Sequence, residues 1–189
     1  MKADETDERL KWKLEGTENL LHTRVFEVLS QHECAHDGTR GEYIALDAAD
    51  WVIVIPVIGD SFLMERQFRH ASLSLSCEFP GGVAGRTEDP EAAARRELLE
   101  ETGYRVGRMT KLAEINPNPA LFKNRLHIFL AEDLVSEGTQ NLDADEFLEY
   151  FLMNRDEVIN SFGTGEFQHG LMATALAFYL IEMKRRGTH

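Results

Sequence analysis

Three glutamates in the middle of the sequence are spaced for a shared role. Glu97, Glu100 and Glu101 stand at i, i+3 and i+4, so a helix would project all three from one face. Like charges at this spacing destabilise a helix by roughly 0.2–0.5 kcal/mol per pair, so we expect a positive partner. Arg96 is one candidate and divalent cations are the other, because clustered carboxylate oxygens suit Mg²⁺ or Mn²⁺. Both partners stay open at this point, and a metal bound here would be Mg²⁺, for which Mn²⁺ could substitute.

The helix that carries these glutamates has clear boundary signals. Asp89 can serve as its N-cap, Pro90 fits the first helical position, and Gly103 can end it in a left-handed conformation. A glycine-rich loop over 78–90 leads into it. We therefore predict a loop followed by a helix between Asp89 and Gly103.

Strand patterns surround this helix. Apolar and β-branched residues predict strands at 24–33, 42–47, 51–58, 61–69, 111–115 and 125–134. The run 51–58 is typical of a strand buried on both faces, although Pro56 places it near an edge or a bulge. Asn154 should cap a short helix, and an amphipathic helix should close the chain from about Phe167 to Arg186. This element order indicates an α+β layered domain.

Length and charge limit the class of protein. A chain of 189 residues suits one domain, at most with a small appendage. The balance of 33 acidic against 20 basic residues, a formal charge of −13, disfavours nucleic-acid and anionic-membrane partners. Two cysteines suit a reducing compartment, and the first residues hold no apolar signal segment. We expect a cytoplasmic protein that binds neither nucleic acid nor membrane.

The glutamate cluster belongs to a longer pattern with fixed gaps. Gly82 is followed after five residues by Glu88, then after seven by Arg96-Glu97-Leu98, one residue, Glu100-Glu101, one residue and Gly103-Tyr104. This stretch resembles the Nudix box at every fixed position, with Tyr104 where the family usually has an aliphatic residue. The resemblance implies an α/β/α sandwich with a mixed β-sheet and a loop–helix–loop that binds metal. It also implies hydrolysis of a nucleoside diphosphate linked to another group.

The resemblance gives roles to individual positions of the box. The implied metal ligands are Glu97, Glu100, Glu101 and the backbone carbonyl of Gly81. Arg96 would pair with Glu88 to orient the loop and the helix, and would also bond a neighbouring glutamate. We group Arg96 and Glu100 with the catalytic residues as well.

Features outside the box resemble the ADP-ribose pyrophosphatase branch of the family. MERQFR (64–69), EFPGG (78–82) and Pro119 are similar to its Gln-Tyr-Arg strand, its lead-in to the box and its later proline. The implied substrate-binding residues are Arg66, Arg69, Glu78, Pro119, Phe122 and Arg125. Arg66 and Arg69 should point to opposite faces of a strand, and either could instead form a surface salt bridge. Phe122 or Arg125 would reach the base or the terminal sugar.

The catalytic base in this branch comes from a late loop rather than from the box. Glu146, at the end of the acidic stretch 141–146, aligns best with that loop glutamate, and Asp143 and Asp145 are close competitors. A carboxylate here would take a proton from a bound water. The alternative is a merely solvated acidic loop.

The chain before Trp51 is long for a minimal Nudix domain. We place an N-terminal extension with strands at 1–50 and the Nudix domain at 51–189, and the resemblance implies a homodimer formed through the extension. The expected reaction is Mg²⁺-dependent hydrolysis of a nucleoside diphosphate sugar, ADP-ribose first, to AMP and ribose 5-phosphate. GDP-mannose or another nucleotide sugar is the alternative substrate. A module that senses ADP-ribose without cleaving it is the alternative of another class, but it should lack metal carboxylates, and here all are present.

Overall fold

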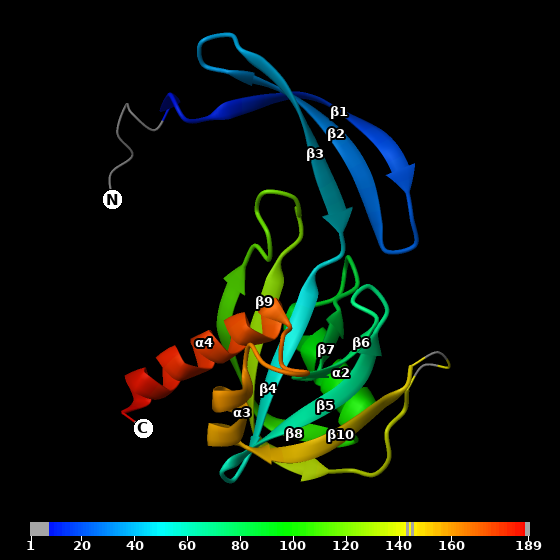
Figure 1. Cartoon of the computed structure of the whole chain (residues 1–189), viewed down its shortest axis with the longest axis vertical. Coiled ribbons are helices and arrows are strands. Elements are labelled where there is room, and N and C mark those ends of the chain that lie inside the picture. The colour runs from blue at the N-terminus through cyan, green and yellow to red at the C-terminus, as the bar shows by residue number, and fades with distance from the viewer. Residues whose placement is uncertain (1–7, 143, 145, 188–189) are drawn as a thin grey trace. The chain divides into compact units, whose positions relative to one another are not determined.

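The computed structural model describes residues 8–142, 144 and 146–187, and the chain divides into two compact units (Figure 1). The first unit holds the chain up to Ala49 together with 116–124. The second unit holds 50–115 and the chain from Arg125 onward. The loop 116–124 therefore belongs with the N-terminal strands rather than with the segments that flank it in sequence.

A three-stranded antiparallel sheet forms the first unit. Its strands, in spatial order, are β1 (Trp12–His22), β2 (Phe26–Ala35) and β3 (Arg40–Ala48). The segment 116–124 joins β3 through backbone hydrogen bonds between Leu46 and both Leu121 and Lys123. The sequence pattern predicts β2 and β3 but not β1, because β1 lacks a regular apolar alternation and nearly all of its side chains are exposed.

A mixed sheet of seven strands forms the centre of the second unit. Its strands are β4 (Trp51–Ile58), β5 (Ser61–Arg69), β6 (Ser74–Glu78), β7 (Gly81–Val83), β8 (Tyr104–Ile115), β9 (Leu126–Ser136) and β10 (Leu148–Asn154). Five of them lie in the order β10-β5-β4-β9-β8, while β6 pairs with β5 and β7 pairs with β4. β4 and β9 run parallel, and the other pairs are antiparallel.

Helices cover both faces of this sheet (Figure 1). Helix α2 (Pro90–Thr102) packs on one face against Val52 and Val54 of β4. Helices α3 (Arg155–Ser161) and α4 (Gly170–Arg186) pack on the other face, in the core that holds Ile53 and Ile55. Side chains of β4 thus alternate between two cores, which explains its continuous apolar run. The predicted α+β sandwich with a mixed sheet is confirmed.

Pro56 does not mark a sheet edge, and that part of the prediction is wrong. β4 lies inside the sheet, with β9 along one side. On its other side it pairs with β7 over Trp51–Ile53 and with β5 over Val57–Ile58. Pro56 falls in the gap between these two ladders, so an interior strand tolerates its missing N–H.

Other differences from the sequence prediction concern short or edge elements. The pattern does not predict β6, β7 or β10, because β6 and β7 are short and β10 is an edge strand of mixed polarity. β8 begins at Tyr104, directly after helix α2. Helix α4 begins at Gly170 instead of Phe167 and is capped by the His169 side chain, which accepts the Leu171 N–H at 3.2 Å. No helix within the described ranges is long and apolar enough to cross a membrane.

Candidate active site

Helix α2 is bounded by the residues that the sequence predicts. The Asp89 side chain accepts a hydrogen bond from the Ala92 N–H at 3.0 Å, and Gly103 takes a left-handed φ of 70°. A Cβ at Gly103 would lie 2.6 Å from the carbonyl oxygen of Gly138, so the loop after β9 packs directly on the helix end. The helix is thus held at both ends, which fixes the starting points of its glutamate side chains.

Arg96 binds three acidic side chains around the helix. Its guanidinium donates two hydrogen bonds of 3.0 and 3.1 Å to Glu88, and contacts Glu97 and Glu100 at 3.0 Å each. Glu88 also accepts the Gly85 N–H at 3.0 Å, which ties the loop before the helix to this pair. The predicted contact between Arg96 and Glu88 is present, and Arg96 is a positive partner of the glutamate cluster.

Gly82 makes room for the carboxylate of Glu97. A Cβ at Gly82 would lie 2.5 Å from the Glu97 carboxyl group, so a side chain at this position would displace it. Burial, helped by the charges of Glu100 and Glu146, raises the pKa of Glu97 even though Arg96 opposes the change. Strand β7 and helix α2 therefore meet around a carboxylate that lacks full solvation.

Glu101 is a deeply buried helix glutamate, with 5% of its surface exposed. Its Oε2 atom accepts a hydrogen bond from the Gly81 N–H at 3.0 Å. Burial and the nearby charge of Glu97 raise the pKa of Glu101 to about 8. A cation bound beside Glu101 would favour its ionised form, because an opposite charge stabilises a carboxylate.

Glu65 on β5 lies beside Glu101, and sequence reasoning missed it. Its side chain is completely buried, and neither carboxyl oxygen has a hydrogen-bond donor among the described residues. Burial, and then the charge of Glu101, raise the pKa of Glu65. The signal in the sequence is weak: Glu65 follows the apolar run 62–64, two residues after Leu63, so the two side chains share a face of the strand.

The two arginines of β5 have different partners, as expected for residues on opposite faces of a strand. Arg69 forms a two-pronged ion pair with Glu78, with Nε 2.8 Å from Oε1. Burial by itself would raise the pKa of Glu78, but the Arg69 guanidinium lowers it below its usual value. Because Glu78 is completely buried, it would act on a substrate through Arg69. Arg66 is bound by Glu166, with Nε 2.7 Å from Oε2.

The loop between β9 and β10 brings Glu146 to the helix glutamates. The Asn141 N–H donates to the Glu100 carbonyl at 2.8 Å, which attaches this loop to helix α2. Glu146 lies close enough for its charge to raise the pKa of Glu97. The competing bases Asp143 and Asp145 lie outside the described residues.

The box glutamates, Arg69, Arg96 and Glu146 line a cavity of about 460 Å³ together with other residues, and we call it the acidic cavity. Its lining residues are Gln67, Arg69, Gly81, Gly82, Val83, Arg96, Glu97, Glu100, Glu101, Asn141, Leu142, Glu146 and Leu148. A second cavity of about 290 Å³ shares Arg69 and 81–83 with it. This second cavity, the apolar cavity, is also lined by Trp51, Leu126 and Met172. Arg69 thus belongs to the wall of both cavities.

The donors of the acidic cavity fit a hard divalent cation. Its acidic side chains offer carboxylate oxygens, the ligands that Mg²⁺ and Mn²⁺ prefer. The buried carboxyl group of Glu65 has no hydrogen-bond donor among the described residues. Within the described part of the chain, no three acidic, histidine or cysteine side chains already converge on one point. Arg96 instead contacts Glu97 and Glu100. Metal binding would require these carboxylates to turn from the guanidinium.

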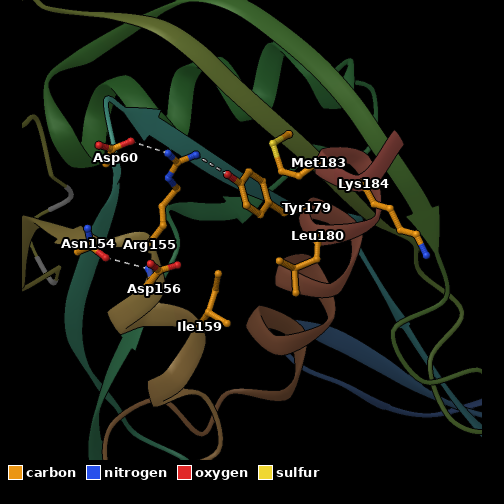
Figure 2. Close-up of a pocket in the computed structure, with 9 residues that line it drawn as sticks. All are labelled: Asp60, Asn154, Arg155, Asp156, Ile159, Tyr179, Leu180, Met183 and Lys184. Atoms are coloured by element: carbon orange, nitrogen blue, oxygen red, sulfur yellow. Dashed lines mark hydrogen bonds and ion pairs between the residues drawn. The ribbon is translucent and has the colours of Figure 1, made fainter. Parts of the chain in front are cut away.

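A larger cavity, of about 570 Å³, lies beside α3 and α4 and is lined by no residue of the acidic cavity. Figure 2 shows Arg155 there, held by Asp60 at 2.8 Å and by the Tyr179 hydroxyl at 2.9 Å. Leu180 and Met183 of helix α4 form part of the wall. This cavity holds none of the box glutamates, so we place the chemistry in the smaller acidic cavity.

Two of the remaining predicted residues, Arg66 and Arg125, line neither of the adjoining cavities, and two others belong to the first unit. Arg125 donates its backbone N–H to Asp50 at 2.8 Å and is absent from both cavity walls, as is Arg66. Pro119 and Phe122 belong to the first unit, so their part in substrate binding stays a prediction.

Comparison with known proteins points to one family. The family model described as NUDIX domain matches residues 48–174. The chain is 33% identical over 117 residues to the ADP-ribose pyrophosphatase of Bacillus subtilis (strain 168), which covers 61% of this chain and 63% of that protein. It is 28% identical over 133 residues to the ADP compounds hydrolase NudE of Escherichia coli (strain K12), which covers 69% and 70%. The chain thus spans about three fifths of the length of the Bacillus subtilis relative.

A solved structure shares the fold over nearly the whole chain. It is described as the crystal structure of ADP compounds hydrolase, with a TM-score of 0.83 and 23% sequence identity. The likeness covers 95% of this chain and 97% of that one. At this identity it shows the architecture, which agrees with the sandwich described above.

Proposed function

We propose that this chain, which belongs to the Nudix family, hydrolyses the pyrophosphate bond of a nucleoside diphosphate sugar. ADP-ribose is the first candidate, and its products would be AMP and ribose 5-phosphate. The observation that carries the proposal is the acidic cavity, whose wall combines the box glutamates with Glu146 and Arg69. The match of the NUDIX domain model to 48–174 supports it.

The box glutamates are the residues that would hold Mg²⁺, or Mn²⁺ in its place. Glu97, Glu100, Glu101 and the Gly81 carbonyl form the proposed ligand set. When bound, the cation would neutralise phosphate oxygens and lower the pKa of a coordinated water. Arg96 stays attached to Glu88 through two hydrogen bonds, so it would remain beside the glutamates after they turn to the cation.

Glu146 is the proposed general base. It lines the acidic cavity, and the loop that carries it is bonded to helix α2. A carboxylate in this place would accept a proton from the attacking water. Arg69 is the proposed phosphate ligand, because its guanidinium is fixed by Glu78 before any substrate arrives and needs little reorganisation.

The adjoining cavities favour a substrate with an organic group beyond its phosphates. If the phosphates bind at Arg69, the adjoining apolar cavity, lined by Trp51 and Leu126, is available to a nucleobase or a sugar. The names of the Bacillus subtilis and Escherichia coli relatives, an ADP-ribose pyrophosphatase and an ADP compounds hydrolase, support this substrate class. A sensing module without activity is less consistent with a cavity that keeps all three glutamates proposed to hold the metal.

A substrate panel tests the proposal. The full chain would be assayed with Mg²⁺ on ADP-ribose, GDP-mannose, dinucleotides and nucleoside triphosphates, with product phosphate released by a phosphatase. We expect the highest kcat/KM for ADP-ribose, and the Glu97→Gln variant purified in parallel should show that a contaminant is not responsible. A preference for GDP-mannose would change the sugar and the base but keep the class. Comparable or better turnover of triphosphates would overturn the assignment.

We also propose that the first unit mediates a homodimer. Its strand β1 exposes Leu14, Leu20 and Leu21, each by half or more of its surface, and this apolar surface is available to a second copy of the chain. Analytical ultracentrifugation of the full chain should give twice the chain mass. A monomer at micromolar concentration would contradict the dimer without affecting the hydrolase proposal. The cytoplasmic location expected from the sequence stays a prediction.

A further inference from the structure

Glu65 is a buried carboxyl group without a donor. It is completely inaccessible to solvent, and in the described part of the chain its oxygens meet no N–H or hydroxyl donor; the polar group that approaches them is the carboxyl of Glu101. Its strand is paired on both sides, so the backbone cannot move outward to expose it. Buried polar groups in folded proteins are almost always satisfied, and one that is not calls for an explanation.

The side chain of Glu65 points toward the helix that carries the box glutamates. Leu63, two residues earlier on β5, packs in the core formed with helix α2. Residues two apart on a strand share a face, so Glu65 lies on the α2 side as well. Glu101 of helix α2 is a close electrostatic neighbour of Glu65. Glu65 therefore lies on the α2 side of the sheet as a neighbour of Glu101, although it is not itself part of the wall of the acidic cavity.

The surroundings of Glu65 hold more negative than positive charge. Glu78 stands directly opposite Glu65 on β6, and Glu101 approaches from α2. Arg69 is the cationic neighbour, but two of its nitrogens already bond Glu78. One guanidinium thus faces three carboxyl groups, so a further cation would be favourable here.

We propose that Glu65 is a further ligand of the metal centre. From strand β5 it would bind the same divalent cation that Glu101 binds from helix α2. The inference rests on the proposed function, which supplies the cation. Glu101 uses Oε2 for the Gly81 N–H, which leaves Oε1 for the cation. Glu65 lies outside the box, so the centre would be closed from the sheet side by a residue that the box pattern does not contain. A proton shared between the two carboxyls is the rival explanation, and it gives Glu65 no part in metal binding.

The test is Mn²⁺ binding to the full chain, measured by calorimetry and by electron paramagnetic resonance of free Mn²⁺. Glu65→Gln keeps the shape of the side chain and removes its charge. We expect this variant to bind Mn²⁺ about 10–100-fold more weakly than the natural chain, the range seen when groups that support a metal site are removed. Glu132→Gln is the matched control, because Glu132 pairs with Arg108 and Arg186 and lines neither cavity. It should bind Mn²⁺ normally.

Thermal unfolding separates a ligand from a packing residue. Without metal, Glu65→Gln should melt at the same temperature as the natural chain or higher, because a buried unpaired carboxyl has been removed. With Mn²⁺, its melting temperature should rise less than that of the natural chain, since stabilisation follows affinity. If Glu65→Gln does not fold, Glu65→Asp, which keeps the charge but shortens the reach, should show the weaker Mn²⁺ binding instead.

Two results would contradict different parts of the account, the role of Glu65 and the proposed function. Unchanged Mn²⁺ affinity and stoichiometry in Glu65→Gln, or in Glu65→Asp where that variant must be used, would overturn the role of Glu65 and leave the proposed function intact. Absence of Mn²⁺ binding to the natural chain would overturn the proposed metal-dependent function itself. An anomalous manganese signal in crystals, at coordination distance from a Glu65 oxygen, would support the role directly.

Discussion

The two faces of the seven-stranded sheet are built from the same strands but bury different residues. The face under α3 and α4 holds aromatic and aliphatic side chains, among them Phe62, whose ring meets Phe79 and Tyr179 edge-on. The face under α2 holds a smaller apolar core and the buried carboxyls of Glu65 and Glu101. Because side chains alternate along a strand, a single residue step separates the two environments.

This difference assigns stability and chemistry to opposite faces. Apolar burial on the α4 face contributes roughly 25 cal/mol per Å² removed from water, whereas a buried carboxyl without a cation opposes folding. Substitutions on the α4 face should therefore lower the free energy of unfolding and spare turnover by folded molecules. Substitutions of the buried carboxyl groups on the α2 face should instead lower turnover without lowering the free energy of unfolding.

Glu97→Gln should give the largest effect. The variant keeps the size of the side chain but loses a proposed metal ligand, so kcat should fall ~10³-fold, which is about 4 kcal/mol of transition-state stabilisation. The melting temperature without metal should not fall, because burial disfavours the charge that is removed. Steady-state kinetics over a Mg²⁺ titration measures the first effect and calorimetry the second. A variant that loses stability but keeps kcat would reverse the comparison.

Phe62→Ala probes the opposite face. Phe62 is completely buried, and its truncation should cost about 3–5 kcal/mol of unfolding free energy, measured by urea denaturation. Phe68→Ala on the same strand is the control, since Phe68 is exposed and should lose less than about 0.5 kcal/mol. The kcat of the folded fraction should be unchanged in both. A specific loss of kcat in Phe62→Ala would show that the two faces are coupled.

Glu146→Gln sharpens the assignment of the base. Removal of a general base should lower kcat ~10²-fold, or about 2.7 kcal/mol, with little change in stability. The side chain is exposed on a loop, which is why folding should be insensitive to it. Rapid-quench kinetics with ADP-ribose would measure the chemical step. A rate near that of the natural chain would move the role to Asp143, Asp145 or the box.

The arginines of β5 provide the smallest and most closely matched test. Arg69→Lys cannot keep both bonds to Glu78, and we expect kcat/KM for ADP-ribose to fall about tenfold. Arg66→Lys removes a similar pair with Glu166 that lines neither cavity, and kcat/KM should be unchanged. Equal losses in the two variants would contradict the separation of the faces.

Local signals explain what the sequence could predict. Asp89 and Gly103 bound helix α2 through capping interactions within a few residues, and the i, i+3, i+4 spacing places its glutamates on one side. Such features need no knowledge of the tertiary fold. The contact between Arg96 and Glu88, by contrast, is expected from the resemblance to the Nudix box and not from spacing.

Features that depend on distant strands escaped prediction. Glu65 in isolation resembles a surface residue at the end of an apolar run, and its burial follows only when β6, β10 and α2 close around it. Pro56 suggested an edge because a single strand does not reveal where its neighbours begin and end. Strand β10 pairs with β5, more than eighty residues away in sequence, and its own alternation is weak.

Metal-dependent turnover of ADP-ribose is the most direct test of the central claim. The full chain would be freed of metal with a chelator, and release of AMP and ribose 5-phosphate would be followed before and after Mg²⁺ is added. We predict no measurable hydrolysis in the chelated sample and full recovery with Mg²⁺. Hydrolysis at the same rate in the presence of chelator, or none after Mg²⁺ is restored, would contradict the assignment of the acidic cavity as the catalytic centre.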